Sequence, residues 1–486
     1  MRTREIFKKA FRLIYILLLV SGLGCVLFGS KQLITINIAL VVFITSVFVP
    51  LIVYTNNKRF DPFEPIYIFS LFFVSLYGIS SLYVYNRKEI FSSSMTADIY
   101  RVNEVVPIIY VLAFSYLVFY AIYRIRMSKL RETNNNFISA SYPKSQRTVI
   151  FLLYAISIIF RIYGYSTGKL GSLVQDRGFS FPGASILLFI SNIWFVYFSY
   201  YTVRFFQKNI QLWTWLSLVI IEGSIILISG DRRYVLLILF IILAAYYYKY
   251  KNLPWRILSI GGLFLFFIYL PFTTLYGYLL GAEAMTSTKL DFSSLIAAVL
   301  SQIQSMSIDE VVADFILNPI AESMFLLPTC QIAYTSFDIV GIHWGGVGIM
   351  NLINSVVPSF LIPRTDVRPY IQLFTDDALS YHTDYSPLTF QMPTEGIVCF
   401  GLYSLPVIYL LIGIVLSGVY KLLFIKHNYY FSKIIYISLI FWLTYCFQFG
   451  LLTTEFTTPF RVLIYYLLIY YCFGFNKKRL IEPSKS

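Results

Sequence analysis

Arginines lie in several short stretches between apolar runs, and their chemistry suits the binding of phosphate groups. A guanidinium group is planar, donates paired hydrogen bonds to phosphate oxygens and stays charged where water is scarce. Several arginines near one face would therefore form a site for a diphosphate. The candidate diphosphate- or glycan-binding residues are Arg177, Arg232, Arg233, Arg364, Arg368 and Arg461. For each single arginine, the alternative is a side chain that only reaches toward lipid headgroups.

Three residues close together late in the chain are candidates for a general base. His382 lies among acidic residues, Asp384 follows it, and Glu395 stands at the start of an apolar run. A histidine or carboxylate in such a place can accept the proton of an attacking hydroxyl. Two alternatives stay open: His382 as a solvated loop residue, and Glu395 as a carboxylate that stabilises a helix N-terminus.

We expect neither a metal nor a cofactor. Asp376 and Asp377 are adjacent, but a metal site needs more ligands nearby. The five cysteines are scattered along the chain, without the spacing of a metal site or a disulfide framework.

The candidate residues stand between or beside long apolar runs, which therefore position them. Of the whole chain, 58% is hydrophobic and only 13% is charged. That composition excludes an ordinary soluble protein. An apolar helix of about 20 residues crosses the hydrocarbon core of a bilayer, and the backbone inside lipid must be helical. We therefore predict an all-α polytopic membrane protein with about twelve transmembrane helices. Their approximate ranges are 12–29, 33–54, 65–86, 105–123, 148–165, 184–206, 210–229, 233–249, 257–278, 394–420, 433–453 and 459–475.

Charge predicts how these spans are oriented. If they alternate, one side receives most of the 38 Lys and Arg residues but few of the 24 Asp and Glu residues. The positive-inside rule makes that side cytoplasmic, together with both termini. The net charge of +14 is then explained by short loops that face anionic lipid, so no nucleic-acid partner is expected.

The same alternation places a long loop, residues 279–393, outside the membrane. Arginines, histidines and acids collect in it, which favours chemistry at that face over simple passage through the bilayer. Two stretches, LIAAVLSQIQSM and DEVVADFILNPIAESMFLL, are amphipathic and suited to lying on the membrane. The predicted division is a bundle of about nine helices at 1–278, this loop, three helices at 394–475 and a cytoplasmic tail at 476–486.

A few charged residues fall inside the predicted spans. Arg161, Glu222 and Arg461 are examples, and Glu455 is a nearby partner for Arg461. An unpaired charge in lipid costs several kcal/mol, so each is a functional candidate. An ion pair between helices is an equal alternative to a substrate contact.

Four stretches, in this order, resemble the O-antigen polymerases, also called oligosaccharide repeat-unit polymerases. They are DPFEPIYIFSLFFVSLYGISSLY, ISGDRRYVLLILFIILAAYYYKYK, IPRTDVRP and PTEGIVCFGLYSLPVIYLLIGIVL. In the second stretch, Arg232 matches the arginine of a Gly-x-Arg element that opens a helix in this family. The loop at Arg177 does not fit the Arg-to-Gly spacing found in some members.

The resemblance implies a membrane glycosyltransferase of the GT-C-like class, inverting and independent of metal. Such an enzyme polymerises undecaprenyl-diphosphate-linked oligosaccharides into O-antigen, capsule or exopolysaccharide at the outer face of the bacterial cytoplasmic membrane. Its partners would be those lipid-linked oligosaccharides and membrane lipids, and a chain-length regulator protein is a further candidate. The alternatives are an O-antigen ligase, and a lipid-linked oligosaccharide flippase or other transporter.

Overall fold

In the computed structural model, every regular element that is described is a helix. The described residues are 36–57, 61–82, 102–128, 144–166, 193–229, 232–254, 258–259, 301, 330, 333–334, 392–426, 433, 435–440 and 443.

Four of the described helices are long and apolar enough to cross a membrane. They are Ile36–Thr55, Pro65–Leu82, Glu104–Ser128 and Leu402–Ile425. Three further apolar helices are shorter, at Phe151–Tyr163, Leu212–Ile225 and Leu237–Tyr250. For the described part of the chain, these helices confirm an all-helical protein of the membrane type. The total of about twelve spans stays a prediction.

The predicted spans and the observed helices agree to within several residues where both can be compared. Six of the helices that overlap predicted spans are α2 (Ile36–Asn57), α5 (Val102–Ser128), α6 (Lys144–Ser166), α8 (Trp194–Phe206), α9 (Leu212–Ser229) and α10 (Arg232–Tyr250). The agreement arises because an apolar run long enough to cross a bilayer can hydrogen-bond its own backbone N–H and C=O groups only as a helix. The predicted spans at 12–29 and 459–475, nearly all of 257–278, most of 433–453 and the first residues of 184–206 lie outside the described residues. Most of the loop 279–393 and the tail 476–486 lie outside them as well.

The predicted span 394–420 is divided rather than continuous. A short helix, α19 (Met392–Phe400), ends at Gly401, which has a φ of 82°. The 3-10 turn η6 (Leu402–Ser404), the helix α20 (Leu405–Val419) and the π-helix η7 (Tyr420–Lys426) follow. Glycine adopts this left-handed conformation without the steric cost of a Cβ, so the chain can turn there.

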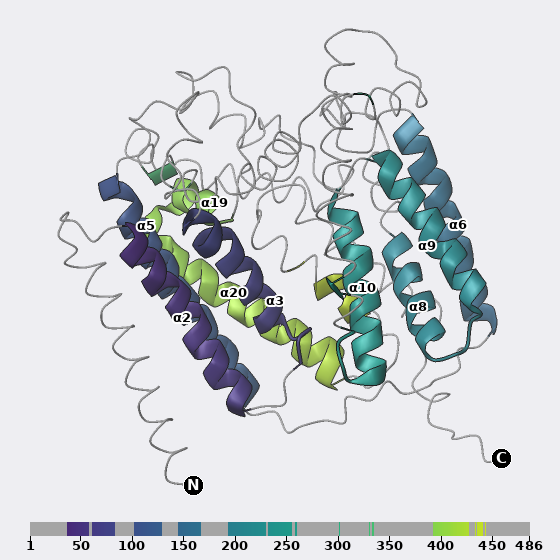
Figure 1. Ribbon diagram of the computed structural model, residues 1–486, viewed down its shortest axis with the longest axis horizontal. Coiled ribbons are helices and arrows are strands. Elements are labelled where there is room, and N and C mark those ends of the chain that lie inside the picture. The colour runs from purple at the N-terminus through teal and green to yellow at the C-terminus, as the bar shows by residue number, and fades with distance from the viewer. Residues whose placement is uncertain are drawn as a thin grey trace, which may run out of the picture. The chain divides into compact units, whose positions relative to one another are not determined.

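The described helices fall into two compact units. The first holds α2, α3 (Pro65–Phe73), the π-helix η1 (Val74–Ile79), α5 and the segment from α19 to η7 (Figure 1). Within it, α5 packs against both α2 and α20. Helices distant in sequence thus share one core, and the division of the chain by the long loop stays a prediction.

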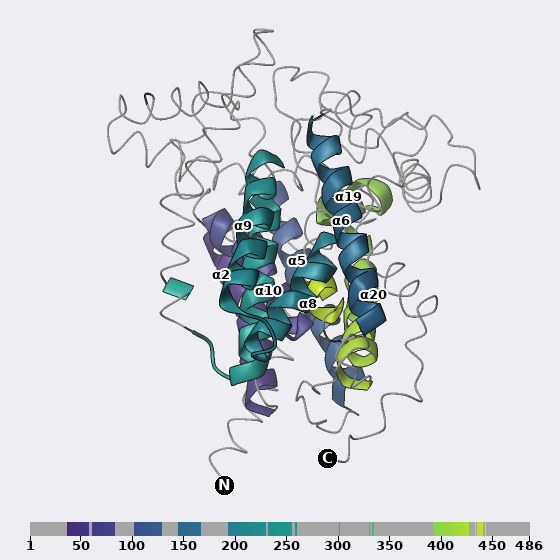
Figure 2. The same ribbon diagram turned by 90° about the vertical axis from the view of Figure 1, so that its right-hand side faces the viewer.

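The second unit holds α6, α8, α9 and α10. Helix α8 contacts each of the other three (Figure 2). Trp194, Phe195, Phe198 and Tyr200 of α8 are all buried. Ser199 of the same helix forms a hydrogen bond of 2.7 Å with Ser438, which belongs to this unit as well. Aromatic side chains therefore fill the space between these helices.

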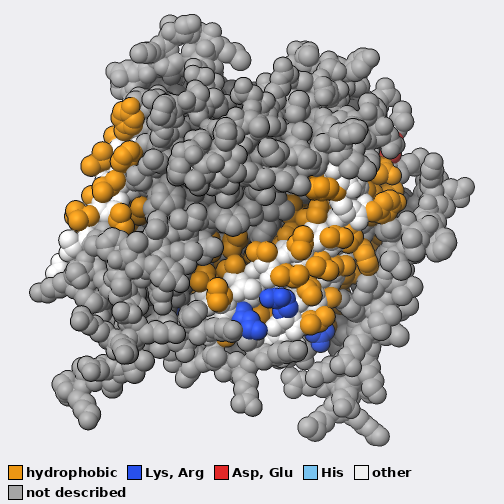
Figure 3. Space-filling model, turned by 180° about the vertical axis from the view of Figure 1, so that it is seen from behind, with side chains coloured by type: hydrophobic (Ala, Val, Ile, Leu, Met, Phe, Trp, Pro, Cys, Tyr) orange, Lys and Arg blue, Asp and Glu red, His pale blue; other side chains and the backbone are white. Residues whose placement is uncertain are grey.

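Hydrophobic side chains cover much of the described surface in Figure 3, and basic side chains gather at one end of that surface. Exposed apolar residues of the first unit include Ile38, Phe48, Ile52, Leu71, Ile125, Val407 and Leu411. Arg124 and Arg126 are exposed near the end of α5. An apolar surface with cations at its edge is what a bilayer and its headgroups accommodate.

Helices α5 and α20 approach so closely at Gly413 that we expect a larger residue there to destabilise the fold. A Cβ at Gly413 would lie 2.3 Å from Ile122 Cγ2 and 3.0 Å from the Phe119 carbonyl oxygen, whereas at Gly418 of the same helix the nearest atom is Arg126 Nη2, 3.9 Å away. Gly413→Ala should therefore lower the free energy of unfolding by about 1–3 kcal/mol. Gly418→Ala should leave it unchanged or raise it by up to about 1 kcal/mol. Thermal unfolding in detergent measures both, and equal effects would contradict the packing described.

Candidate functional site

Among the residues predicted to do chemistry, Glu395 is described together with its side chain. Arg232 and Arg233 begin helix α10, but their side chains lie outside the described residues. The rest of the predicted set is also outside: Arg177, Arg364, Arg368, His382, Asp384 and Arg461. The convergence of these arginines into one diphosphate site therefore stays a prediction.

Glu395 is buried, with 2% of its surface exposed. It lies in the first turn of α19, and the eight residues from Met392 to Cys399 are all buried. It is thus part of a separate short helix that precedes the membrane-length helix Leu402–Ile425, rather than the first residue of a span. A buried carboxylate in this position can act as an acid or a base only on groups brought into the core beside it.

The residues around Glu395 come from three separate parts of the sequence. Thr394 Oγ1 lies 3.3 Å from the Cys330 Sγ, within hydrogen-bonding distance. Tyr77 lies within electrostatic range of Cys330, Glu395 and Tyr409. All five side chains are buried. We call these residues (Tyr77, Cys330, Thr394, Glu395 and Tyr409) the Glu395 cluster.

Cys330 enters this cluster from the predicted long loop. Burial raises the pKa of its thiol to about 12, although the hydrogen bond with Thr394 lowers it in part. The thiol is therefore neutral at physiological pH, and a neutral thiol is a poor nucleophile. In this cluster Glu395 is the candidate for proton transfer to or from an alcohol.

The backbone is irregular beside Glu395, and its polar groups are satisfied within the chain. The Ser404 hydroxyl donates to the carbonyl oxygens of Gly396 (3.2 Å) and Gly401 (2.8 Å). The Gly401 N–H donates to the Ile397 carbonyl oxygen at 2.8 Å. Gly396 packs tightly on α20, since a Cβ there would approach Leu405 and Ile408 side-chain carbons to 2.8 Å. Non-helical backbone at membrane depth is tolerated where protein surrounds it in this way.

A second buried cluster occupies the opposite end of the first unit, at the start of α3. The Glu64 carboxylate accepts hydrogen bonds from the hydroxyls of Tyr54 (2.5 Å) and Tyr123 (3.0 Å). Tyr420 donates to Asp61 Oδ2 at 3.2 Å. The sequence DPFEP marked this segment by resemblance, but it did not reveal that both acids are buried. Two acids, each followed directly by a proline at the start of an apolar run, were the available signal.

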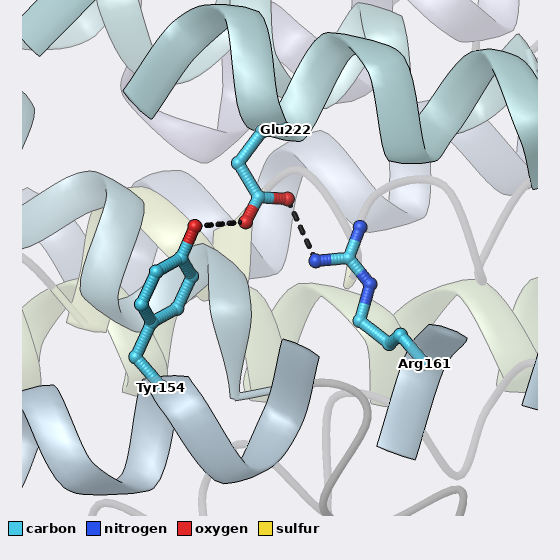
Figure 4. Close-up of polar contacts among 3 residues, drawn as sticks. All are labelled: Tyr154, Arg161 and Glu222. Atoms are coloured by element: carbon cyan, nitrogen blue, oxygen red, sulfur yellow. Dashed lines mark hydrogen bonds and ion pairs between the residues drawn. The ribbon is translucent and has the colours of Figure 1, made fainter. Parts of the chain in front are cut away.

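A third cluster lies in the second unit and joins α6 to α9 (Figure 4). Arg161 Nη1 donates to Glu222 Oε2 at 2.7 Å, and the Tyr154 hydroxyl donates to Glu222 Oε1 at 2.5 Å. The guanidinium carbon of Arg161 lies 5.0 Å from the centre of the Trp194 ring, a cation–π contact. Two of the charges suspected within spans, Arg161 and Glu222, are therefore partners of one another. Among the described residues, no group of three or more His, Cys, Asp or Glu side chains could hold a metal ion.

Comparison with known proteins gives no significant match to any protein-family model, curated protein or solved structure.

The buried ion pair predicts a strong asymmetry between single and double substitutions. Arg161→Met leaves the Glu222 carboxylate buried without its cation, and should lower the free energy of unfolding by about 3–5 kcal/mol. Arg161→Met combined with Glu222→Leu removes both charges and should recover most of that loss. The exposed Arg126→Met serves as a control and should change stability by less than about 0.5 kcal/mol. Unfolding in detergent measures all three, and a double variant as unstable as the single one would contradict the assignment.

Proposed function

We propose that the protein is a membrane glycosyltransferase that polymerises undecaprenyl-diphosphate-linked oligosaccharide repeat units into a surface polysaccharide. The reaction would take place at the outer face of a bacterial cytoplasmic membrane, with both termini in the cytoplasm. Its supports are the ordered resemblance to O-antigen polymerases and the apolar helices. The observation that carries it is the place of Glu395, a buried carboxylate at a broken helix directly after the long loop.

The chemistry follows from the two substrates. A hydroxyl oxygen of the next lipid-linked repeat unit attacks the anomeric carbon of the growing glycan. The bond from that carbon to the diphosphate oxygen breaks, and the lipid diphosphate leaves with the bonding electrons. The hydroxyl proton passes to a carboxylate or imidazole, for which Glu395, His382 and Asp384 are the candidates. A single displacement of this kind inverts the anomeric centre.

The leaving diphosphate needs cations as its negative charge develops. Arg177, Arg232, Arg233, Arg364, Arg368 and Arg461 are the residues proposed to supply them. In this scheme the arginines do the work that a bound metal does in other enzymes. The lipid-linked sugar is already activated, so the reaction consumes no nucleotide.

A lipid-linked oligosaccharide flippase is the second candidate, favoured by the Arg161–Glu222 pair. Both residues are buried in apolar helices, with exposed fractions of 1% and 0%. Ionisable groups inside membrane helices often mark a substrate or ion pathway. Such a protein would move its substrate across the bilayer without changing it.

Purified protein in detergent, given lipid-linked repeat units alone, should produce a ladder of lengthening glycans. Glu395→Gln should reduce the rate by roughly 10²–10⁴-fold if Glu395 is the base. Arg232→Ala and Arg364→Ala should suppress the ladder while the protein stays folded, because they remove cations from the leaving group. Glu104→Gln, at the start of α5, is the matched carboxylate control and should leave the rate unchanged.

Other results of the same experiment distinguish the alternatives. Glycan transfer that begins only after a separate envelope acceptor is added would identify a ligase. Unchanged substrate, combined with movement of the lipid across proteoliposomes, would identify a flippase. An unchanged rate in Glu395→Gln would leave His382 and Asp384 as the candidates for the base.

A further inference from the structure

We propose that the Glu395 cluster is a binding subsite for a hydroxyl group of the acceptor sugar, held between the hydroxyl of Tyr409 and the carboxylate of Glu395. The identification of the ligand as a sugar rests on the proposed function. The existence of a polar subsite rests on the geometry of the cluster.

The Tyr409 side chain is fully buried, and its hydroxyl has no hydrogen-bond partner among the described residues. Several other tyrosines of the same unit form hydrogen bonds through their hydroxyls. The hydroxyls of Tyr54 and Tyr123 bond to Glu64, that of Tyr420 to Asp61, and that of Tyr116 to Ser70. A buried hydroxyl without a partner costs free energy, so its position here points to a ligand that supplies the partner.

The cluster around Tyr409 contains both donors and acceptors. Tyr409 lies within electrostatic range of Cys330 and Tyr77, and Tyr77 lies within the same range of Glu395. A sugar hydroxyl donates one hydrogen bond and accepts others. It could therefore donate to the Glu395 carboxylate and accept from the Tyr409 hydroxyl. Edge-to-face contacts of the Tyr409 ring with Phe73 (5.4 Å) and Phe69 (6.0 Å) give this cluster an apolar wall.

Two irregular pieces of backbone lie beside this cluster. Tyr77 belongs to the π-helix Val74–Ile79, and Glu395 belongs to the short helix that ends at Gly401. Short π-helical segments occur frequently at functional sites. Interrupted membrane helices commonly form binding sites, because their backbone is irregular where a ligand binds. Both irregular segments are observations independent of the Tyr409 hydroxyl, and both contribute a residue to the same cluster.

The charge of the cluster selects the kind of ligand. Glu395 contributes a carboxylate, whereas Thr394, Tyr77 and Tyr409 contribute hydroxyls and Cys330 contributes a neutral thiol. The carboxylate would repel a diphosphate. A divalent cation would need more oxygen ligands with negative charge than one carboxylate provides. A neutral group rich in hydroxyls fits this set best, and in the proposed reaction that group is the acceptor sugar.

Tyr409→Phe separates a binding role from a structural one. A purely structural hydroxyl without a partner can be removed at no loss, so the melting temperature of the free protein should stay the same or rise. The KM for the lipid-linked acceptor should rise about tenfold, as expected for the loss of one hydrogen bond to a ligand. Tyr116→Phe is the matched control. It loses the 2.6 Å hydrogen bond with Ser70, so its melting temperature should fall while its KM stays at the wild-type value.

Ligand-induced thermal shifts test binding without turnover. Lipid-linked repeat units isolated from the host should raise the melting temperature of the wild type more than undecaprenyl diphosphate without sugar does. Tyr409→Phe should lose that additional rise and keep the part caused by the lipid diphosphate, whereas Tyr116→Phe should keep both.

Each failure has its own signature. A Tyr409→Phe protein with wild-type KM and the full sugar-dependent rise would overturn the subsite. A wild-type protein that forms no glycan ladder, yet shows a sugar-dependent rise that Tyr409→Phe abolishes, would overturn the polymerase and support the subsite.

Discussion

Polar groups buried among apolar helices must find their hydrogen-bond partners inside the chain, and the arrangement of this protein depends on that constraint. Lipid offers no donor or acceptor, so an unsatisfied group there costs several kcal/mol. The Glu222 carboxylate is satisfied in this way: one oxygen accepts a hydrogen bond from Tyr154 and the other accepts one from Arg161. Glu64 is likewise satisfied through Tyr54 and Tyr123. In both cases a single carboxylate ties together helices that are distant in sequence.

The same constraint accounts for where the polar clusters of the first unit lie. Tyr54 near the end of α2, Glu64 at the start of α3 and Tyr123 near the end of α5 meet at one end of the unit. Tyr77, later in the α3–η1 helix, lies within electrostatic range of Glu395 of α19 at the other end. Successive helices therefore run in alternating directions. The exposed Arg124 and Arg126 lie at the end that holds Glu64, and under the proposed orientation this end is the cytoplasmic one. Glu395 would then face outward, where the proposed substrates are.

We expect binding or catalysis in such a protein where a buried polar group is not satisfied within the chain, rather than where it is. The ion pair of Arg161 and Glu222 joins two helices and has close partners. The Glu395 cluster combines a carboxylate, a helix broken at Gly401, a π-helical segment and the Tyr409 hydroxyl, which has no hydrogen-bond partner among the described residues. Structures keep such costly features at sites of binding or catalysis, where a ligand compensates for them. The proposed acceptor subsite therefore belongs to the first unit.

The sequence by itself determined the helical membrane class and, within the part of the chain that is described, most helix boundaries, because a long apolar run has one stable backbone conformation in lipid. It also singled out Arg161, Glu222 and Glu395 as charges in or beside apolar helices. It did not predict the break at Gly401, since glycines occur in continuous membrane helices as well. Nor did it pair Arg161 with Glu222, 61 positions away, or bring Cys330 to Thr394. Those contacts were decided by tertiary structure, because hydropathy depends on neighbours along the chain, whereas hydrogen bonds and close packing depend on which helix faces meet in space.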